Sequence, residues 1–200
     1  MQSKPSRKEI PTMKHLVNRV FVTAVVLGLC IPAWAQDIPF VPSPMIVVDR
    51  MLELAEVKKD DIIYDLGSGD GRILIQAAKK YGARGVGIDM NPKLVADATR
   101  KAAEENVSHL VQFRAADGLT VDISDATVVT LYMFKWFNNQ MRPKLQQLQP
   151  GSRVVAHDFD IDEWVPNKVE NVDPKSDPSG ELTHARTLYL WKVGTPAQIP

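Results

Sequence analysis

The chain has 200 residues, 44% hydrophobic and 24% charged, which is the composition of one globular domain with a sizeable core. Its formal charge is zero, but the first 35 residues hold five basic groups and one acidic group, so the remaining 19 basic and 23 acidic groups give −4. This balance gives no support to nucleic-acid binding through a general basic face, and the single cysteine, Cys30, excludes an internal disulfide and a cysteine zinc cluster.

The first 35 residues have the layout of a targeting segment. A basic stretch precedes the apolar run Val20–Ile31, and Ala33-Trp34-Ala35 forms a small-x-small cleavage site. We therefore expect a signal peptide over residues 1–35, cleaved after Ala35, and an exported, periplasmic or secreted domain over residues 36–200. The alternative is an uncleaved inner-membrane anchor, although the apolar run is shorter than the roughly 20 residues that span a bilayer comfortably.

A helix is predicted directly after a proline-rich arm. Pro39 and Pro42 keep the arm extended, and Ser43 followed by Pro44 is a typical start of a helix. The apolar residues that follow recur at helical spacing: Met45, Val48, Met51, Leu52 and Ala55. We expect this helix to cover a ligand pocket or a sheet edge, or simply to pack into the core.

The segment Tyr64–Arg72 carries the strongest functional signal. It reads YDLGSGDGR, follows the apolar pair Ile62-Ile63 and precedes a run with helical spacing that stops at Gly82. Such a sequence predicts a buried strand, a tight glycine turn and a helix, which together present backbone N–H groups and the positive helix end to a ligand. Arg72 stands where a dinucleotide-binding fingerprint has its third glycine, and Asp65, directly before the turn, would repel a pyrophosphate.

The pattern resembles the acidic GxGxG motif of class I S-adenosylmethionine-dependent methyltransferases. The resemblance implies an α/β, Rossmann-like fold, with a mostly parallel seven-stranded sheet, helices on both faces and an antiparallel last strand. It also implies S-adenosyl-L-methionine as the cofactor, no metal, and cofactor-binding residues in and beside the turn: Asp65, Gly67, Ser68, Gly69 and Gly71. The alternative is a glycine turn without a ligand.

Two further acids end predicted strands. The strand Gly85–Asp89 ends in a carboxylate, and Asp89 lies 24 residues after Asp65 of the first strand. This separation is near the roughly 20 residues expected for an acid that accepts ribose hydroxyls. We therefore assign Asp89, with Met90 beside it, to cofactor binding, and a helix-capping aspartate is the alternative. The next strand, Val111–Asp117, ends in an acid that the resemblance places at the exocyclic amine of adenine, whereas a turn cap is the alternative for Asp117.

The fourth predicted strand, Thr127–Tyr132, should end beside the transferable methyl group, because open α/β sheets bind ligands outside the carboxyl ends of their strands. The chain continues as MFKWFN and lacks the Asp/Asn-Pro-Pro-Tyr segment of nitrogen methyltransferases that act on adenine or glutamine. An aromatic mouth suits a neutral amine in a narrow channel, although aromatic residues after a strand also serve as core. Tyr132 and Asn138 are the candidate catalytic residues, which would orient the amine without a strong general base.

The C-terminal third completes the predicted sheet. Residues 138–148 are predicted to be helical, and Ser152–Phe159 is predicted as the fifth strand. His157, near the exit of that strand, is either structural or, with a reference pKa near 6.5, a proton acceptor. Val169–Val172 and Thr187–Val193 are the expected last strands, joined by a polar hairpin.

The resemblance narrows to the protein-lysine methyltransferases, a family that includes a broad-specificity archaeal enzyme and mitochondrial enzymes acting on lysines of the ATP synthase c-subunit and the adenine nucleotide translocase. Five segments carry it: Pro44–Leu54, Tyr64–Ile73, Ala126–Tyr132, Arg142–Leu145 and Pro150–His157. The family implies N-methylation of protein lysine side chains by in-line transfer, with a protein partner, membrane proteins included, and no nucleic acid. The alternatives are a small-molecule O- or N-methyltransferase, a non-catalytic exported Rossmann-like binding module, and a nucleotide-dependent oxidoreductase, which would need a glycine at Arg72.

Overall fold

The computed structural model describes residues 40–197, which belong to one compact unit that begins at Phe40. The expected signal peptide, its cleavage after Ala35, and Cys30 lie outside the described residues. Within the described part of the chain, no helix is long and apolar enough to cross a membrane.

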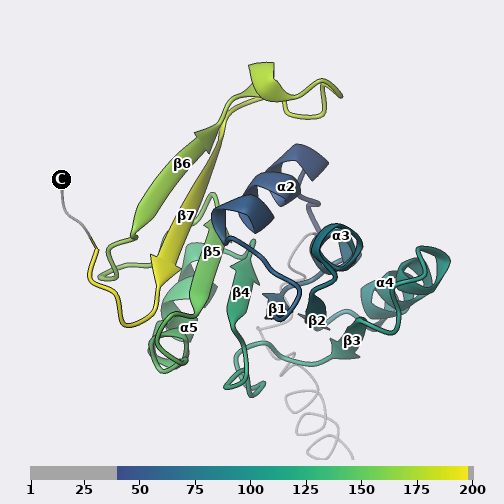
Figure 1. Cartoon of the computed structure of the whole chain (residues 1–200), viewed down its shortest axis with the longest axis horizontal. Helices are drawn as coiled ribbons and strands as arrows, with labels where there is room; N and C mark the ends of the chain where they lie inside the picture. The colour runs from purple at the N-terminus through teal and green to yellow at the C-terminus, as the bar shows by residue number, and fades with distance from the viewer. Residues whose placement is uncertain (1–39, 198–200) are drawn as a thin grey trace, which may run out of the picture. The chain divides into compact units, whose positions relative to one another are not determined.

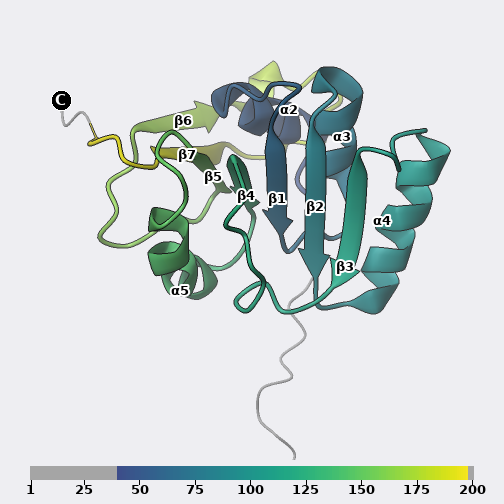
Figure 2. The ribbon, with the colours of Figure 1, turned by 60° about the horizontal axis from the view of Figure 1, so that its bottom comes forward.

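A seven-stranded sheet forms the centre of this unit, in the order β3-β2-β1-β4-β5-β7-β6 (Figures 1 and 2). The neighbours from β3 to β5 pair in parallel, while β7 is antiparallel to both β5 and β6. This arrangement confirms the predicted sheet with an antiparallel last strand. The strands are β1 (Ile62–Leu66), β2 (Arg84–Asp89), β3 (Val111–Ala115), β4 (Val128–Leu131), β5 (Arg153–His157), β6 (Lys168–Val172) and β7 (Arg186–Lys192).

Helices cover both faces of the sheet, as expected. α2 (Met45–Leu54), α3 (Arg72–Tyr81) and α4 (Pro92–Glu104) lie on one face, and α5 (Lys135–Gln146) lies on the other (Figure 2). A short 3-10 helix, η1 (Pro174–Ser176), lies in the connection between β6 and β7. Because β1 to β5 run parallel to one another, their carboxyl ends lie at the same edge of the sheet.

Two helix ends show where the sequence pattern was and was not sufficient. α3 stops where predicted because Gly82 adopts the left-handed conformation, with φ at 68°, that commonly ends a helix. α5 begins at Lys135, three residues before the predicted start, and runs through Pro143. The sequence prediction was wrong here because burial of Phe137 in the core favours an additional turn of helix ahead of the proline.

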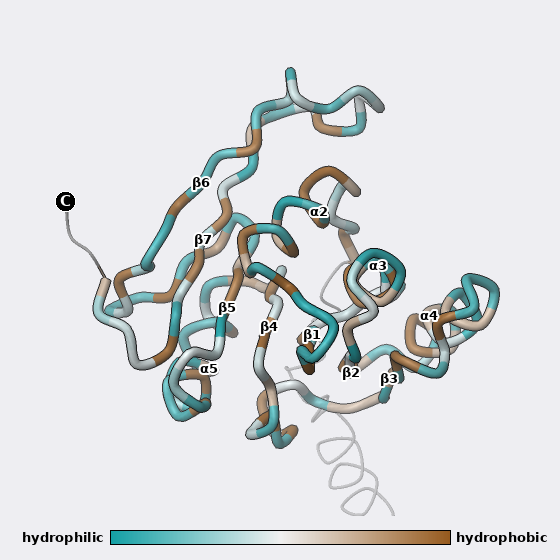
Figure 3. Tube along the Cα trace, viewed as in Figure 1, coloured by the Kyte–Doolittle hydropathy of each residue, from teal (hydrophilic) through white to brown (hydrophobic). Residues whose placement is uncertain are grey.

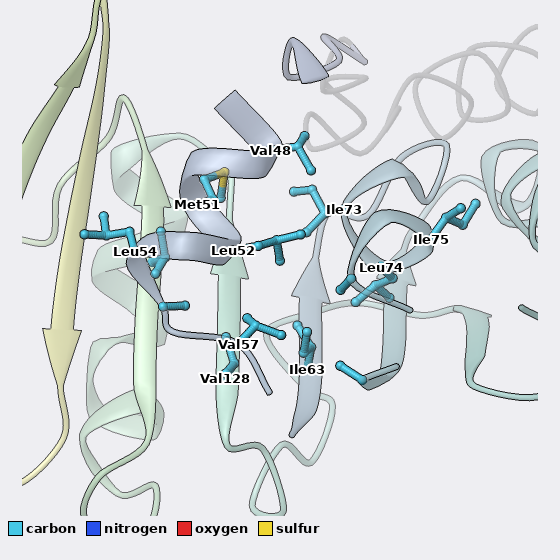
Figure 4. Packing of buried hydrophobic residues seen from close by; sticks show 14 of the residues in the cluster. Val48, Met51, Leu52, Leu54, Val57, Ile63, Ile73, Leu74, Ile75 and Val128 are labelled. Atoms are coloured by element: carbon cyan, nitrogen blue, oxygen red, sulfur yellow. The ribbon is translucent and has the colours of Figure 1, made fainter. Parts of the chain in front are cut away.

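Two hydrophobic clusters fill the two faces. The first packs α2 and α3 onto the sheet through the residues labelled in Figure 4: Val48, Met51, Leu52, Leu54, Val57, Ile63, Ile73, Leu74, Ile75 and Val128. The second packs α5 onto the opposite face through Phe137, Met141 and Leu145, with Trp191 of β7 beside them. Figure 3 shows hydrophobic and hydrophilic positions alternating along α3 and α4, as expected for helices with one buried side.

A buried polar clamp holds the amino ends of three strands together. Asp61, directly before β1, accepts hydrogen bonds from Thr127 Oγ1 at 2.7 Å and from Arg153 Nη2 at 2.6 Å. Thr127 precedes β4 and Arg153 begins β5, so the clamp joins β1, β4 and β5. Burial raises the pKa of Asp61, but the bonds from Arg153 and Thr127 outweigh it and leave the pKa lowered. The clamp lies at the edge opposite to the carboxyl ends of these strands.

Candidate functional site

The turn between β1 and α3 is left-handed at all three glycines. The φ angle is 83° at Gly67, 53° at Gly69 and 78° at Gly71, a conformation that disfavours other side chains. The N–H groups of Gly67 and Ser68 donate to the carbonyl oxygen of Ile88 at 2.8 and 3.0 Å, which fastens the turn to β2. The three glycines are therefore required by the backbone of this turn.

Asp65 lies near the carboxyl end of β1 and is buried. Its Oδ1 accepts a hydrogen bond from Thr130 Oγ1 at 2.8 Å, while its Oδ2 has no partner among the described residues. Burial raises the pKa of Asp65 to about 7; the Thr130 bond acts against this rise, and the nearby Asp89 and Asp70 add to it. A cation at Oδ2 would favour the ionised carboxylate, so Asp65 is suited to a positively charged ligand.

The other predicted cofactor residues lie at the same edge. Asp89, the last residue of β2, accepts hydrogen bonds from the N–H groups of Gly69 at 2.9 Å and Asn91 at 2.8 Å. Each carboxylate oxygen keeps a second lone pair for a ribose hydroxyl, so Asp89 can cap the backbone and bind ligand. Met90 is 70% exposed. Asp117 follows β3 and accepts a hydrogen bond from the backbone two residues on, at 2.9 Å. The ligand roles of these residues stay predictions.

Asp70 is a structural residue of the turn that sequence reasoning missed. It is buried and accepts hydrogen bonds from Arg72 Nε at 2.9 Å, Arg72 Nη2 at 2.8 Å and Lys101 Nζ at 2.7 Å. Burial raises the pKa of Asp70, but the two cations outweigh it and lower the pKa to about 2. Because Lys101 belongs to α4, Asp70 joins the turn to both α3 and α4. The neighbouring Arg72 was a local signal for this pairing, whereas the distant Lys101 was not.

Aromatic side chains gather where β4 and β5 end. The Tyr132 ring stacks on His157 with centroids 3.9 Å apart and lies 6.4 Å from the Phe159 ring. Phe134 packs edge-on against Phe159 at 5.8 Å and is 40% exposed, and Trp136 is 49% exposed. Burial raises the pKa of Tyr132, with Arg186 opposing. Tyr132 therefore lies half-buried within a cluster of rings at the carboxyl ends of the parallel strands, which we call the ligand edge. Its catalytic role stays a prediction.

Asn138 lies deeper than Tyr132. It is fully buried in the first turns of α5, and its Nδ2 donates to the carbonyl oxygen of Phe159 at 2.9 Å. Its Oδ1 has no partner within residues 40–197. The contact of Asn138 with Phe159 anchors the loop after β5, and its predicted role in orienting an amine stays a prediction.

His157, the last residue of β5, is the buried polar centre of the ring cluster. Its Nδ1 lies 2.9 Å from Ser43 Oγ, and its Nε2 has no hydrogen-bond partner in the described part of the chain. Asp158 Oδ2 lies 3.5 Å from Nε2 and accepts a hydrogen bond from Arg186 Nη1 at 2.7 Å. Burial lowers the pKa of His157 to about 4, with Asp158 opposing and Arg186 adding to the shift. The imidazole is therefore neutral at pH 7.

Buried polar atoms without a hydrogen-bond partner mark one edge of the sheet. Among the described side chains they are Asp65 Oδ2, Ser68 Oγ, Asn138 Oδ1, His157 Nε2 and Arg186 Nε. All lie just beyond or at the carboxyl ends of β1, β4 and β5, or at the start of the antiparallel β7. An unpaired buried polar group costs about 1–3 kcal/mol, so a ligand that pairs with these atoms would be stabilised at this edge.

Two other features help to define the site. A groove of about 480 Å³, lined by residues of α2, β6 and β7 with both signs of charge, contains none of these unpaired atoms. Within residues 40–197, no group of three His, Cys, Asp or Glu side chains is placed to hold a metal ion. The unpaired buried polar atoms of the described residues are thus concentrated at the carboxyl edge of the sheet.

Comparisons with known proteins agree with this geometry. The family model of the ANTKMT methyltransferase domain matches residues 65–168. A protein-lysine N-methyltransferase of Saccharolobus islandicus is 40% identical over 164 residues, which cover 81% of this chain and 98% of that protein. A lysine N-methyltransferase of the ATP synthase c-subunit, from Xenopus laevis, is 35% identical over 80% of this chain and 68% of its own length.

A similar solved structure is also that of a methyltransferase. A crystal structure described as an RNA methyltransferase from Salinibacter ruber, in complex with S-adenosyl-L-homocysteine, is 50% identical and superposes with a TM-score of 0.68. The match covers 80% of this chain and 97% of that one. The sequence matches, the sheet order and the acidic glycine turn all agree. The chain therefore belongs to the family of the ANTKMT methyltransferase domain and is an S-adenosyl-L-methionine-dependent methyltransferase.

Proposed function

We propose that this enzyme methylates the side-chain amine of protein lysines. The similarity to the protein-lysine N-methyltransferase of Saccharolobus islandicus carries the proposal, because the aligned residues, 40% of them identical, cover 98% of that relative and so include the part that binds the methyl acceptor. Membership of a methyltransferase family also removes the oxidoreductase alternative.

The residues of the ligand edge fit the cofactor. When bound, S-adenosyl-L-methionine supplies a methyl carbon activated by a sulfonium cation. Asp65 and Ser68 each offer a buried oxygen without a partner among the described residues, so they can pair with the polar amino-acid part of the ligand. Asp89 would accept ribose hydroxyls, with Met90 beside it, and Asp117 would accept the adenine amine.

The cluster of Tyr132, His157 and Phe159 at the ends of β4 and β5, called the acceptor side below, favours a neutral amine. A lysine with a pKa near 10.4 must lose its proton before the nitrogen lone pair can attack, and nearby positive charge lowers that pKa. The Asp158 carboxylate is already paired with Arg186, so it is not free to stabilise an ammonium ion. The rings of Tyr132 and Phe159 offer apolar contact to the aliphatic part of the side chain.

An RNA substrate is the second candidate function, because the Salinibacter ruber structure with 50% identity is described as an RNA methyltransferase. Binding to RNA requires basic groups that neutralise phosphates. The chain after residue 35 has 19 basic and 23 acidic groups, which favours a protein acceptor over RNA.

The decisive experiment offers both acceptors to the full chain. The enzyme is incubated with S-adenosyl-L-methionine labelled in its methyl group and with polylysine, total RNA or a membrane-protein extract. We expect label in polylysine and in membrane proteins, with methylated lysine identified by mass spectrometry, and loss of label in the Asp89→Ala variant. Label that enters RNA alone would overturn the proposal in favour of the second candidate.

We also propose that the enzyme acts outside the cytoplasm, which residues 1–35 support through their basic start, apolar run and Ala33-Trp34-Ala35 site. S-Adenosylmethionine is made in the cytoplasm, so an exported enzyme would need a supply of cofactor. Fractionation of cells that express the full chain tests the location. A soluble periplasmic or secreted form that begins at Gln36 would support export, a full-length membrane-bound form would support the anchor, and a full-length cytoplasmic form would contradict both.

A further inference from the structure

A short segment before α2 crosses the ligand edge. This segment, residues 40–44, is called the strap below, and Ser43 anchors it at two points. The carbonyl oxygen of Ser43 accepts a hydrogen bond from Arg72 Nη1 at 2.9 Å, and Ser43 Oγ lies 2.9 Å from His157 Nδ1. Arg72 begins α3 after the glycine turn, and His157 ends β5. The strap therefore connects the cofactor turn with the acceptor side.

Phe40, at the start of the strap, lies directly on the glycine turn. A Cβ atom added to Gly69 would collide with the Phe40 ring, so the ring is in contact with the turn backbone. The ring is nevertheless 45% exposed, which leaves apolar area that a ligand on the turn could cover.

The second anchor reaches the acceptor side through one stacking contact. His157 is fully buried, and its ring is stacked against Tyr132 at an interplanar angle of 25°. The hydrogen bond with Ser43 fixes the rotation of the imidazole, and the imidazole in turn restricts the Tyr132 ring. A change in the strap would therefore reach Tyr132 without any direct contact between them.

We propose that the strap is part of the cofactor site, that Phe40 contacts the bound cofactor, and that the Ser43–His157 hydrogen bond seats the strap while positioning Tyr132. The second half rests on the proposed function, because it assigns Tyr132 to the lysine acceptor. In this arrangement His157 is a positioning residue that acts through Tyr132, and Phe40 is a cofactor-binding residue.

Calorimetric titration of the full chain with S-adenosyl-L-homocysteine tests the cofactor half. We expect Phe40→Ala and Ser43→Ala each to weaken binding by about fivefold to tenfold, the factor for loss of one buried contact or hydrogen bond. Ser152→Ala is the matched control, because Ser152 is equally buried and donates one hydrogen bond, at 3.1 Å, to Ala126 at the opposite edge. Equal affinities for Ser43→Ala, Ser152→Ala and the unmodified chain would overturn the strap while leaving the proposed function intact.

Two substitutions of His157 test the positioning half. His157→Phe keeps a ring against Tyr132 but loses the bond to Ser43 that fixes the rotation of this ring, so we expect weaker cofactor binding and a lower kcat, with an unchanged KM for polylysine. His157→Gln keeps a polar partner for Ser43 but loses the ring that positions Tyr132, so we expect unchanged cofactor affinity and a kcat lowered about tenfold. Parallel losses of both properties in both variants would indicate a purely structural role. A wild-type chain that binds S-adenosyl-L-homocysteine but leaves polylysine unmethylated would remove the positioning half together with the proposed function.

Discussion

Asp65 is the residue whose protonation should control cofactor affinity. Burial raises its pKa to about 7, so a large share of the cofactor-free protein carries a neutral Asp65 at pH 7. A cationic ligand selects the ionised form, and below the raised pKa the carboxyl group must first release its proton. We therefore expect the affinity for S-adenosyl-L-methionine to rise by up to about tenfold per pH unit from pH 5.5 to 7 and to level off near pH 8.

Calorimetry of the full chain between pH 5.5 and 8 measures this dependence. Asp65→Asn removes the titrating group, so its binding should be weaker and nearly independent of pH across the same range. Ser152→Ala should keep the slope of the unmodified chain. An undiminished slope in Asp65→Asn would assign the pH dependence to a different group.

Asp70 should matter for stability at the scale of a single side chain. Its carboxylate is buried and paired with both Arg72 and Lys101, and hydrogen bonds to charged groups contribute about 1.5–3 kcal/mol each. We expect Asp70→Asn to lower the free energy of unfolding in urea by about 2–4 kcal/mol. Glu105→Gln breaks the exposed pair with Lys79 and should change it by less than about 1 kcal/mol. Similar losses in both variants would show that the buried network is no stronger than a surface pair.

At the scale of elements, the sequence predicts the features that depend on neighbouring residues, such as helix ends and the spacing of residues within a βαβ unit. α3 was placed correctly because Arg72 and Gly82 mark its ends. Asp89 was placed correctly at the end of β2 because its spacing from β1 is a property of the βαβ unit, while its role in cofactor binding stays a prediction. The contact between Ser43 and His157 joins positions 114 residues apart, and no local pattern announces it. The full burial of Asn138 could not be predicted from the sequence either, because tertiary packing sets the start of α5.

The clamp at the amino ends of β1, β4 and β5 should contribute to the stability of the fold without affecting ligand binding. Asp61→Ala leaves the Arg153 guanidinium without its buried partner, which should lower the free energy of unfolding by about 3–5 kcal/mol. The clamp lies at the edge opposite to the ligand, so the S-adenosyl-L-homocysteine dissociation constant of the folded variant should stay within about twofold of the unmodified value. Urea unfolding and calorimetry at low temperature measure the two quantities. A large loss of affinity in a folded Asp61→Ala protein would mean that the two edges are coupled.

At the scale of the whole molecule, two buried groups act on stability in opposite directions. The pKa of Asp65 is raised from its usual range to about 7, so its favourable contribution is fully present below about pH 3.8 and is lost as pH rises through 7. The pKa of His157 is lowered from 6.5 to about 4, so its contribution is present above pH 6.5 and is lost as pH falls through 4. Each can change the free energy of unfolding by at most about 1.4 kcal/mol per pH unit.

These slopes overlap and oppose each other between pH 4.5 and 6.5, so the unmodified chain should show a nearly constant free energy of unfolding in this range. Removing one group should reveal the other. Asp65→Asn leaves the histidine, and its stability should rise with pH, whereas His157→Gln leaves the aspartate, and its stability should fall with pH. Urea unfolding at pH 4.5, 5.5 and 6.5 measures all three proteins. Slopes of the same sign in both variants would contradict the balance, since either buried group would then titrate in the folded protein much as it does in water.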